Sequence, residues 1–273
     1  MKIGAILLSL GVALPVLAGN YTGLKTSSPD GYRSRGLMMY ENENYIGAID
    51  QLSHLYMTEG GEVYDEDADF YIALSTYEHG DFNCIEMFKK FIAEHPASIK
   101  VAYAHAKIGD CYFLNGQYKD ALAEYGKIVP SAFNNDYKQD LTYRSAYCLL
   151  KLGKHDQARK LFTKLSYTSR YRQAGLFYDG YIAYAGGDYE EATKKFSQLP
   201  PSGELGQASR YYQCQIHFAN GDYDKVMSTG KQLLKSAGDN EEYAGEMNRI
   251  VGESYYHNGD DDKAGEYLAR YIE

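Results

Sequence analysis

The sequence predicts an all-α protein built from about seven consecutive helix-turn-helix units. The main observation is a phrase that returns along the chain, as "NGQYKDAL" at 115, "GGDYEEA" at 186, "NGDYDKV" at 220 and "NGDDDKA" at 258, with looser copies at 41, 79 and 152. A regular period is typical of repeat architectures, in which each unit packs against its neighbours. No segment shows the sustained period-two alternation of a β-strand.

The first eighteen residues, "MKIGAILLSLGVALPVLA", have the features of a secretory signal. A lysine precedes an apolar run from Ile3 to Leu14, and Pro15 breaks the helix. Val16, Leu17 and Ala18 then precede a polar segment, so cleavage is expected after Ala18. The apolar run is shorter than the ~20 residues that span a bilayer, so we expect export rather than a retained anchor. We therefore predict a signal peptide (1–18), a linker (19–28) and a repeat domain (29–273), with no membrane span in the mature chain.

The first helix of each unit is predicted to cross its partner closely. We take as anchor the residue after the Gly-x step of the phrase: Tyr45, Phe82, Tyr118, His155, Tyr189, Tyr223 and Asp261. The residue nine positions before each anchor is never larger than cysteine: Gly36, Ala73, Gly109, Ala146, Gly180, Cys214 and Gly252. A small side chain at a fixed position of every unit indicates a close contact between two helices.

A tight turn is predicted between the two helices of each unit. Six units place a glycine two residues before the anchor: Gly80, Gly116, Gly153, Gly187, Gly221 and Gly259. A glycine after an apolar-periodic stretch ends a helix, because it adopts the left-handed conformation that other residues resist. Asp or Asn beside it can cap the next helix.

The second helix is predicted from apolar residues three, seven and ten positions after the anchor, which form one stripe of an amphipathic helix. Pro96, Pro130 and Pro200 fall where this helix should stop. Each unit is therefore read as helix, turn, helix.

This spacing and residue choice resemble the tetratricopeptide repeat, a helix-turn-helix unit of 34 residues. The unit that follows the pattern most completely contains Ile108, Gly109, Tyr112, Gly116, Tyr118, Ala121, Tyr125 and Ile128. The resemblance extends over about residues 29–273 and implies a right-handed superhelical α-solenoid. His155 and Asp261 depart from it by replacing the aromatic anchor. The last unit stops at residue 273 without a capping helix, so one open alternative is that the repeat domain is the N-terminal part of a longer solenoid.

The resemblance also implies that the first helices line a concave face, with positions twelve and five before the anchor turned toward it. Aromatic residues are frequent there, and they suit interfaces because they bury a large area at low entropic cost. We predict a partner-binding groove centred on units four to six, formed by Tyr143, Tyr147, Phe177, Tyr181, Tyr184, Tyr211 and Phe218. In the alternative, the same rings pack between neighbouring first helices.

Four cysteines, Cys84, Cys111, Cys148 and Cys214, raise the question of disulfides in an exported protein. Adjacent repeats stack about 10 Å apart, whereas a disulfide requires Cα atoms within about 7 Å. We therefore expect four free, mostly buried thiols.

Composition and motifs argue against catalysis and nucleic-acid binding. The seven histidines are scattered, and there is no HExxH, GxSxG or phosphate-binding glycine loop. A formal net charge of −9 without a basic run disfavours a surface that follows phosphates. We expect no enzyme activity, no metal, no cofactor and no nucleic-acid partner.

The predicted function is a non-catalytic scaffold or adaptor of the bacterial cell envelope, periplasmic or associated with the outer membrane. It would bind other proteins or extended peptides on the aromatic-lined concave face. One alternative is a glycan-binding or small-ligand-binding component of an outer-membrane complex, against which the absence of tryptophan counts. Another is a regulatory repeat region of a larger protein. Fold does not decide among them.

Overall fold

The computed structural model of the chain describes residues 28–58, 65–129, 133–168, 170–237 and 241–272. In these ranges it consists of α-helices in sequential pairs and contains no β-strand, which confirms the all-α repeat prediction. The predicted signal peptide, residues 1–18, lies outside the described residues. So do Pro130 and the predicted linker apart from its last residue.

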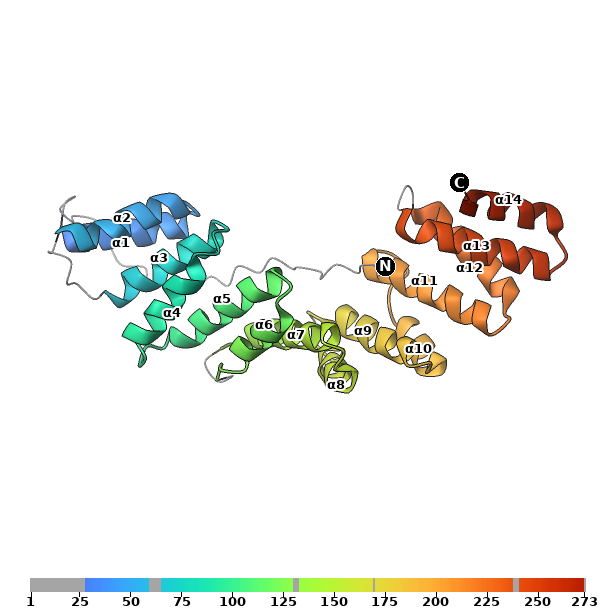
Figure 1. Cartoon of the computed structure of the whole chain (residues 1–273), viewed down its shortest axis with the longest axis horizontal. Coiled ribbons are helices and arrows are strands. Elements are labelled where there is room, and N and C mark those ends of the chain that lie inside the picture. The colour runs from blue at the N-terminus through green and yellow to red at the C-terminus, as the bar shows by residue number, and fades with distance from the viewer. Residues whose placement is uncertain (1–27, 59–64, 130–132, 169, 238–240, 273) are drawn as a thin grey trace. The chain divides into compact units, whose positions relative to one another are not determined.

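The described helices belong to two compact units that divide between Gly153 and Lys154 (Figure 1). The first unit contains α1 (Pro29–Glu41), α2 (Tyr45–Thr58), α3 (Glu66–Glu78), α4 (Cys84–Glu94), α5 (Val101–Leu114), α6 (Tyr118–Tyr125) and α7 (Asn135–Lys151). The second contains α8 (His155–Leu165), α9 (Arg172–Ala185), α10 (Tyr189–Phe196), α11 (Glu204–Ala219), α12 (Tyr223–Ala237), α13 (Glu241–His257) and α14 (Asp261–Ile272). None of these helices combines the length and the apolar character that crossing a bilayer requires.

The second helix of a pair begins at the anchor residue in six of the seven pairs. In the exception, α4 begins at Cys84 rather than at the anchor Phe82. The carboxylate of Asp81 accepts a hydrogen bond from the backbone N–H of Asn83 at 2.9 Å, and this local turn delays the helix. The repeat phase predicted from the sequence is therefore correct.

The turn before each second helix uses a left-handed residue. All six predicted glycines have φ between 71° and 87°. In the first pair, which lacks the glycine, Glu43 takes the same position with φ 58°. This conformation places Cβ of an L-residue close to a carbonyl oxygen, so the first turn stores strain that the others avoid.

The small residue of the first helix lies directly against the side chain seven positions after the anchor. A Cβ atom added to Gly109 would lie 2.5 Å from the ring of Tyr125, and one added to Gly180 would lie 2.9 Å from the ring of Phe196. In the first and last pairs the partner is a leucine, with distances of 2.4 Å for Gly36 and 2.8 Å for Gly252. The predicted close crossing is confirmed at these four pairs.

Each of the two compact units also contains a buried aspartate that joins several helices. In the first unit, the carboxylate of Asp110 accepts hydrogen bonds from the Tyr125 hydroxyl and from Arg144, both at 2.8 Å. In the second, Asp179 accepts from Arg159, Thr163 and Lys195, each at 2.8 Å. Burial opposes the charge of Asp179, but these three donors lower the pKa of its carboxyl group overall. Buried charges are tolerated here because they are fully paired.

The four cysteines are buried and free in the structure, as expected. However, the expectation that cysteines of adjacent repeats lie too far apart for a disulfide is wrong for one pair. The Sγ atoms of Cys84 and Cys111 lie 3.4 Å apart. The ~10 Å spacing refers to helix axes, and each Cα lies about 2.3 Å from its own axis. Cα atoms that face each other across two packed helices are therefore only about 5–6 Å apart, which is within the range of a disulfide.

We predict that Gly109→Ala lowers the free energy of unfolding by about 1–3 kcal/mol, although alanine favours helix formation over glycine. The new methyl group would overlap the ring of Tyr125, which cannot move away without losing its buried hydrogen bond to Asp110. Urea unfolding provides the measurement. Gly126→Ala is the control, since its Cβ meets no atom closer than 3.4 Å. An unchanged or raised stability of Gly109→Ala would contradict the close crossing.

We predict that Glu43→Gly raises the free energy of unfolding by about 1 kcal/mol, because glycine adopts the left-handed conformation without steric cost. The reverse change at the equivalent turn residue, Gly116→Ala, should lower it by a similar amount. That glycine has φ 72° and no neighbour within 4 Å of an added Cβ, so only backbone strain is tested. Thermal melts of the two variants should shift in opposite directions; shifts of the same sign would refute the explanation.

Candidate functional site

The candidate site lies on three successive first helices of the second unit, α9, α11 and α13. We call it the first-helix face and define it by Tyr181, Tyr184, Gln215, Phe218, Glu246, Arg249 and Glu253. All seven side chains are half-buried, so they are held by their neighbours and still reach solvent. Five of them share repeat positions, because Tyr181, Gln215 and Glu253 stand eight residues before an anchor and Tyr184 and Phe218 stand five before. Arg249 and Glu246 lie one and two turns before Glu253 on α13.

The α9 part of the face is formed by two tyrosines that pack on a buried third. The rings of Tyr181 and Tyr184 lie 5.5 and 4.9 Å from the ring of Tyr212, measured between centroids. The Tyr184 hydroxyl donates to Oε1 of Gln215, whose amide nitrogen donates to the Tyr211 hydroxyl at 2.7 Å. Burial raises the pKa of Tyr184, and raises that of Tyr211 to about 12. Both phenols therefore stay neutral at physiological pH.

The α13 part of the face is centred on Arg249, which two neighbouring carboxylates hold in place. The Arg249 guanidinium donates to Glu246 at 2.6 and 2.9 Å and to Glu253 at 2.6 Å. It also lies over the ring of Phe218, 5.6 Å from its centroid. The hydrogen bond to Glu246 is the main reason that the pKa of Arg249 is raised. Two carboxylates surround one cation, so this part of the face carries a net negative charge.

The seven residues predicted for the groove divide between the two units. Tyr143 and Tyr147 belong to the first unit, and the other five belong to the second. Four of the seven are buried, with exposed fractions of 0–9%: Tyr143, Tyr147, Phe177 and Tyr211. The remaining three, Tyr181, Tyr184 and Phe218, are half-buried.

The four buried rings lie in the packing between helices, where the sequence analysis had placed them only as an alternative. Phe177 contacts Phe196 of the same pair and Tyr212 of the next pair, with centroids 5.9 and 6.2 Å apart. Tyr147 packs on Phe113 and Tyr118 of the preceding pair, with centroids 5.6 and 6.0 Å apart. These rings do not offer a free surface, and a role in binding stays a prediction only for the three half-buried ones.

Two polar members of the face, Gln215 and Glu253, were not among the residues predicted for the groove. Gln215 and Glu253 both stand eight residues before an anchor, the position that Tyr147 and Tyr181 occupy in earlier units. Their position in the repeat was therefore the one feature of the sequence that could have placed them on this face. Their hydrogen-bond partners lie on other helices or one turn away, and no local sequence pattern reveals them.

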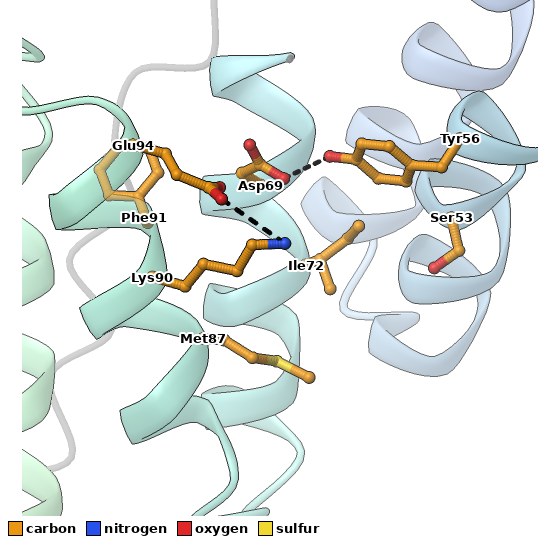
Figure 2. A pocket seen from close by; sticks show the side chains of 8 residues that line it. All are labelled: Ser53, Tyr56, Asp69, Ile72, Met87, Lys90, Phe91 and Glu94. Carbon is orange, nitrogen blue, oxygen red and sulfur yellow. Dashed lines mark hydrogen bonds and ion pairs between the residues drawn. The ribbon is translucent and has the colours of Figure 1, made fainter. Parts of the chain in front are cut away.

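A cavity of about 250 Å³ lies in the first unit, among α2, α3 and α4 (Figure 2). It is lined by Ser53, Tyr56, Asp69, Ile72, Met87, Lys90, Phe91 and Glu94. The Tyr56 hydroxyl donates to Asp69, and the Lys90 ammonium lies 3.8 Å from a carboxylate oxygen of Glu94 (Figure 2). These four polar groups thus already have partners within the protein.

One edge of this cavity brings together three groups that are able to bind a metal ion. Ligand atoms of Asp69, Glu94 and His95 all lie within 4.8 Å of one another. However, Asp69 is hydrogen-bonded to the His95 ring at 2.8 Å as well as to Tyr56, and Glu94 faces Lys90. These contacts account for the carboxylates as a structural network that joins three helices, and the cluster gives no independent indication of a metal.

Comparisons with known proteins agree with this architecture. The family model for the tetratricopeptide repeat matches residues 140–167, which extend from α7 to just beyond α8. A comparison with curated protein sequences finds no significant match.

Similar solved structures share the fold at low sequence identity. A tetratricopeptide repeat protein from Parabacteroides merdae is 12% identical, with a TM-score of 0.55 over 91% of this chain and 93% of that one. PilF from Pseudomonas aeruginosa is 16% identical, with a TM-score of 0.53 over 84% and 97%. MamA from AMB-1 is 20% identical, with a TM-score of 0.50 over 61% and 94%. The chain thus contains one segment that matches the tetratricopeptide repeat, and its helix pairs share the fold of these solved structures.

Proposed function

We propose that the chain is a non-catalytic interaction scaffold that binds a protein or peptide segment on the first-helix face of α9, α11 and α13. Proteins of this repeat type are typically non-catalytic and have protein partners. The observation that carries the proposal is the combination of three half-buried rings with a fixed polar network on consecutive first helices. Aromatic residues and arginine are the residue types enriched at protein interfaces.

The face indicates the chemistry of its partner. Tyr181, Tyr184 and Phe218 offer ring surface to apolar side chains, whereas Glu246 and Glu253 offer acceptors to a positively charged group. The formal net charge of −9 favours the approach of basic segments over longer distances. An extended segment with apolar and basic side chains therefore fits best.

We further propose that the protein acts outside the cytoplasm, in the bacterial periplasm or at the outer membrane. The support is the amino-terminal sequence, in which a lysine precedes an apolar run, Pro15 follows the run, and a polar segment begins after Ala18. This location would make envelope proteins the available partners. The proposed role is thus a scaffold or adaptor of the cell envelope.

The location predicts that the mature protein begins at Gly19. Mass spectrometry of the tagged protein, isolated from the periplasmic and membrane fractions of an exporting cell, measures this directly. A variant with Leu8→Arg in the apolar run should remain unprocessed in the cytoplasm, because a charge in this run opposes insertion. Recovery of the normal sequence in the cytoplasm with Met1 intact would refute export.

The binding face predicts that Tyr184→Ala combined with Phe218→Ala weakens peptide binding by about 2 kcal/mol or more, roughly 30-fold. Peptides would first be selected against the normal protein from a displayed library, and their affinities for the variant then measured by calorimetry. Both rings are half-buried, so their removal should cost less stability than removal of a buried ring.

Tyr167→Ala is the matched control, since this tyrosine lies between α8 and α9 and is 83% exposed. It should bind the selected peptides normally. Equal affinity of the double variant for those peptides would remove the face from the binding surface. Binding of oligosaccharides in place of peptides, lost in the same double variant, would favour the glycan alternative.

A further inference from the structure

Two cysteine side chains meet where the second helix pair of the first unit contacts the third. Cys84 is the first residue of α4, and Cys111 lies near the end of α5, the first helix of the next pair. Their Sγ atoms are 3.4 Å apart although the residues are separated by 27 positions in sequence. Both side chains are 1% exposed and belong to one core cluster with Phe88, Phe91 and Ile108.

We propose that Cys84 and Cys111 are a disulfide site, and that the bond links α4 to α5 when the protein folds in an oxidising compartment. A disulfide bond has an S–S length of about 2.05 Å, so the two sulfur atoms need to approach by only about 1.4 Å. Rotation about the two Cα–Cβ bonds moves sulfur atoms by this amount. The helices already face each other in one core, so no rearrangement of the backbone is required.

The surroundings of the two thiols shift their pKa values in opposite directions. A hydrogen bond from the Cys111 thiol, assisted by backbone N–H groups at the start of α4, lowers the pKa of the Cys84 thiol. The same contact, together with burial, raises the pKa of Cys111. In the reduced, folded protein Cys84 is thus the more acidic thiol of the pair.

The oxidant is a small-molecule or protein disulfide, and the reaction is thiol–disulfide exchange. The Cys111 sulfur first exchanges with that disulfide, forming a mixed disulfide and releasing one thiol. The Cys84 thiolate then attacks the Cys111 sulfur, forming the new S–S bond and releasing the second thiol. The two cysteines lose two protons and two electrons, and the oxidant gains them as its disulfide becomes two thiols. Because both sulfurs are buried, the first exchange takes place before this part of the core closes.

The remaining cysteines provide an internal reference. Cys148 lies on α7 and Cys214 on α11, in separate units, and both are fully buried. Burial raises the pKa of each of these two thiols to about 12, so neither forms a thiolate readily. Of the four cysteines, Cys84 and Cys111 are the pair whose sulfur atoms are brought together by the fold, so we expect one bond to form and two thiols to persist.

The experiment is refolding of the purified, reduced protein in a glutathione buffer with the oxidised form in excess. After acid quenching, free thiols are counted in denaturant and peptides are mapped by mass spectrometry without reduction. We expect the count to fall from four to two. We also expect a cross-linked peptide pair containing Cys84 and Cys111, and a higher melting temperature that a reductant reverses. Four free thiols, or a different pair, would overturn the proposal.

Variants separate the bond from the packing of sulfur atoms. Cys111→Ala should retain three free thiols and lose the effect of redox conditions on melting temperature, whereas Cys214→Ala should still form the bond. A redox effect that persists in Cys111→Ala would refute the assignment.

Bond formation in the cell rests on the proposed export, but refolding in glutathione does not. The in-cell arm traps thiols with an alkylating reagent before lysis. A bond that forms in glutathione but is missing in the cell would contradict the oxidising location while leaving the geometry intact. Failure in glutathione would contradict the site itself, whatever the location.

Discussion

The close crossing between the two helices of a pair is the contact on which the other features depend. At Gly109 and Gly180 the absence of a side chain lets an aromatic ring of the second helix lie against the backbone of the first. The Tyr125 ring then directs its hydroxyl to Asp110, which also binds Arg144 of α7. The absence of a side chain at Gly109 thereby allows the hydrogen bonds that join α5, α6 and α7. These bonds in turn position the next helix pair.

The turn between paired helices keeps this crossing in phase along the chain. A left-handed residue two positions before the anchor ends the first helix, and in six pairs the second helix begins at the anchor. Since the turn has constant length, the small residue and its apolar partner stand sixteen positions apart at the four pairs where the close crossing is seen, as Gly109 and Tyr125 do. Lys89 and Gly230 replace the apolar partner in the second and sixth repeats. Glu43 shows that the conformation is required and glycine is only its least costly residue.

The period and its local consequences could be read from the sequence, whereas side-chain surroundings could not. Small residues, turn glycines and apolar stripes are local patterns with a direct steric meaning. Phe177 and Tyr184, by contrast, stand seven positions apart on one helix stripe, yet only the first is covered completely by neighbouring helices. Sequence spacing does not distinguish these cases. The Cys84–Cys111 contact was not predicted either, because the distance between helix axes was used in place of the shorter distance between facing residues.

The same aromatic cluster stabilises the second unit and shapes its candidate binding face. Tyr212 is buried, and its ring contacts Phe177 and Phe196 below and Tyr181 and Tyr184 toward the surface. The half-buried rings are therefore held in place before any partner arrives. Ordering a flexible side chain on binding costs about 0.5–1.5 kcal/mol, so rings that are already fixed retain more of their contact energy. Packing between repeats therefore also positions the rings of the candidate binding face, and a substitution of the buried Tyr212 should alter the positions of Tyr181 and Tyr184 at the surface.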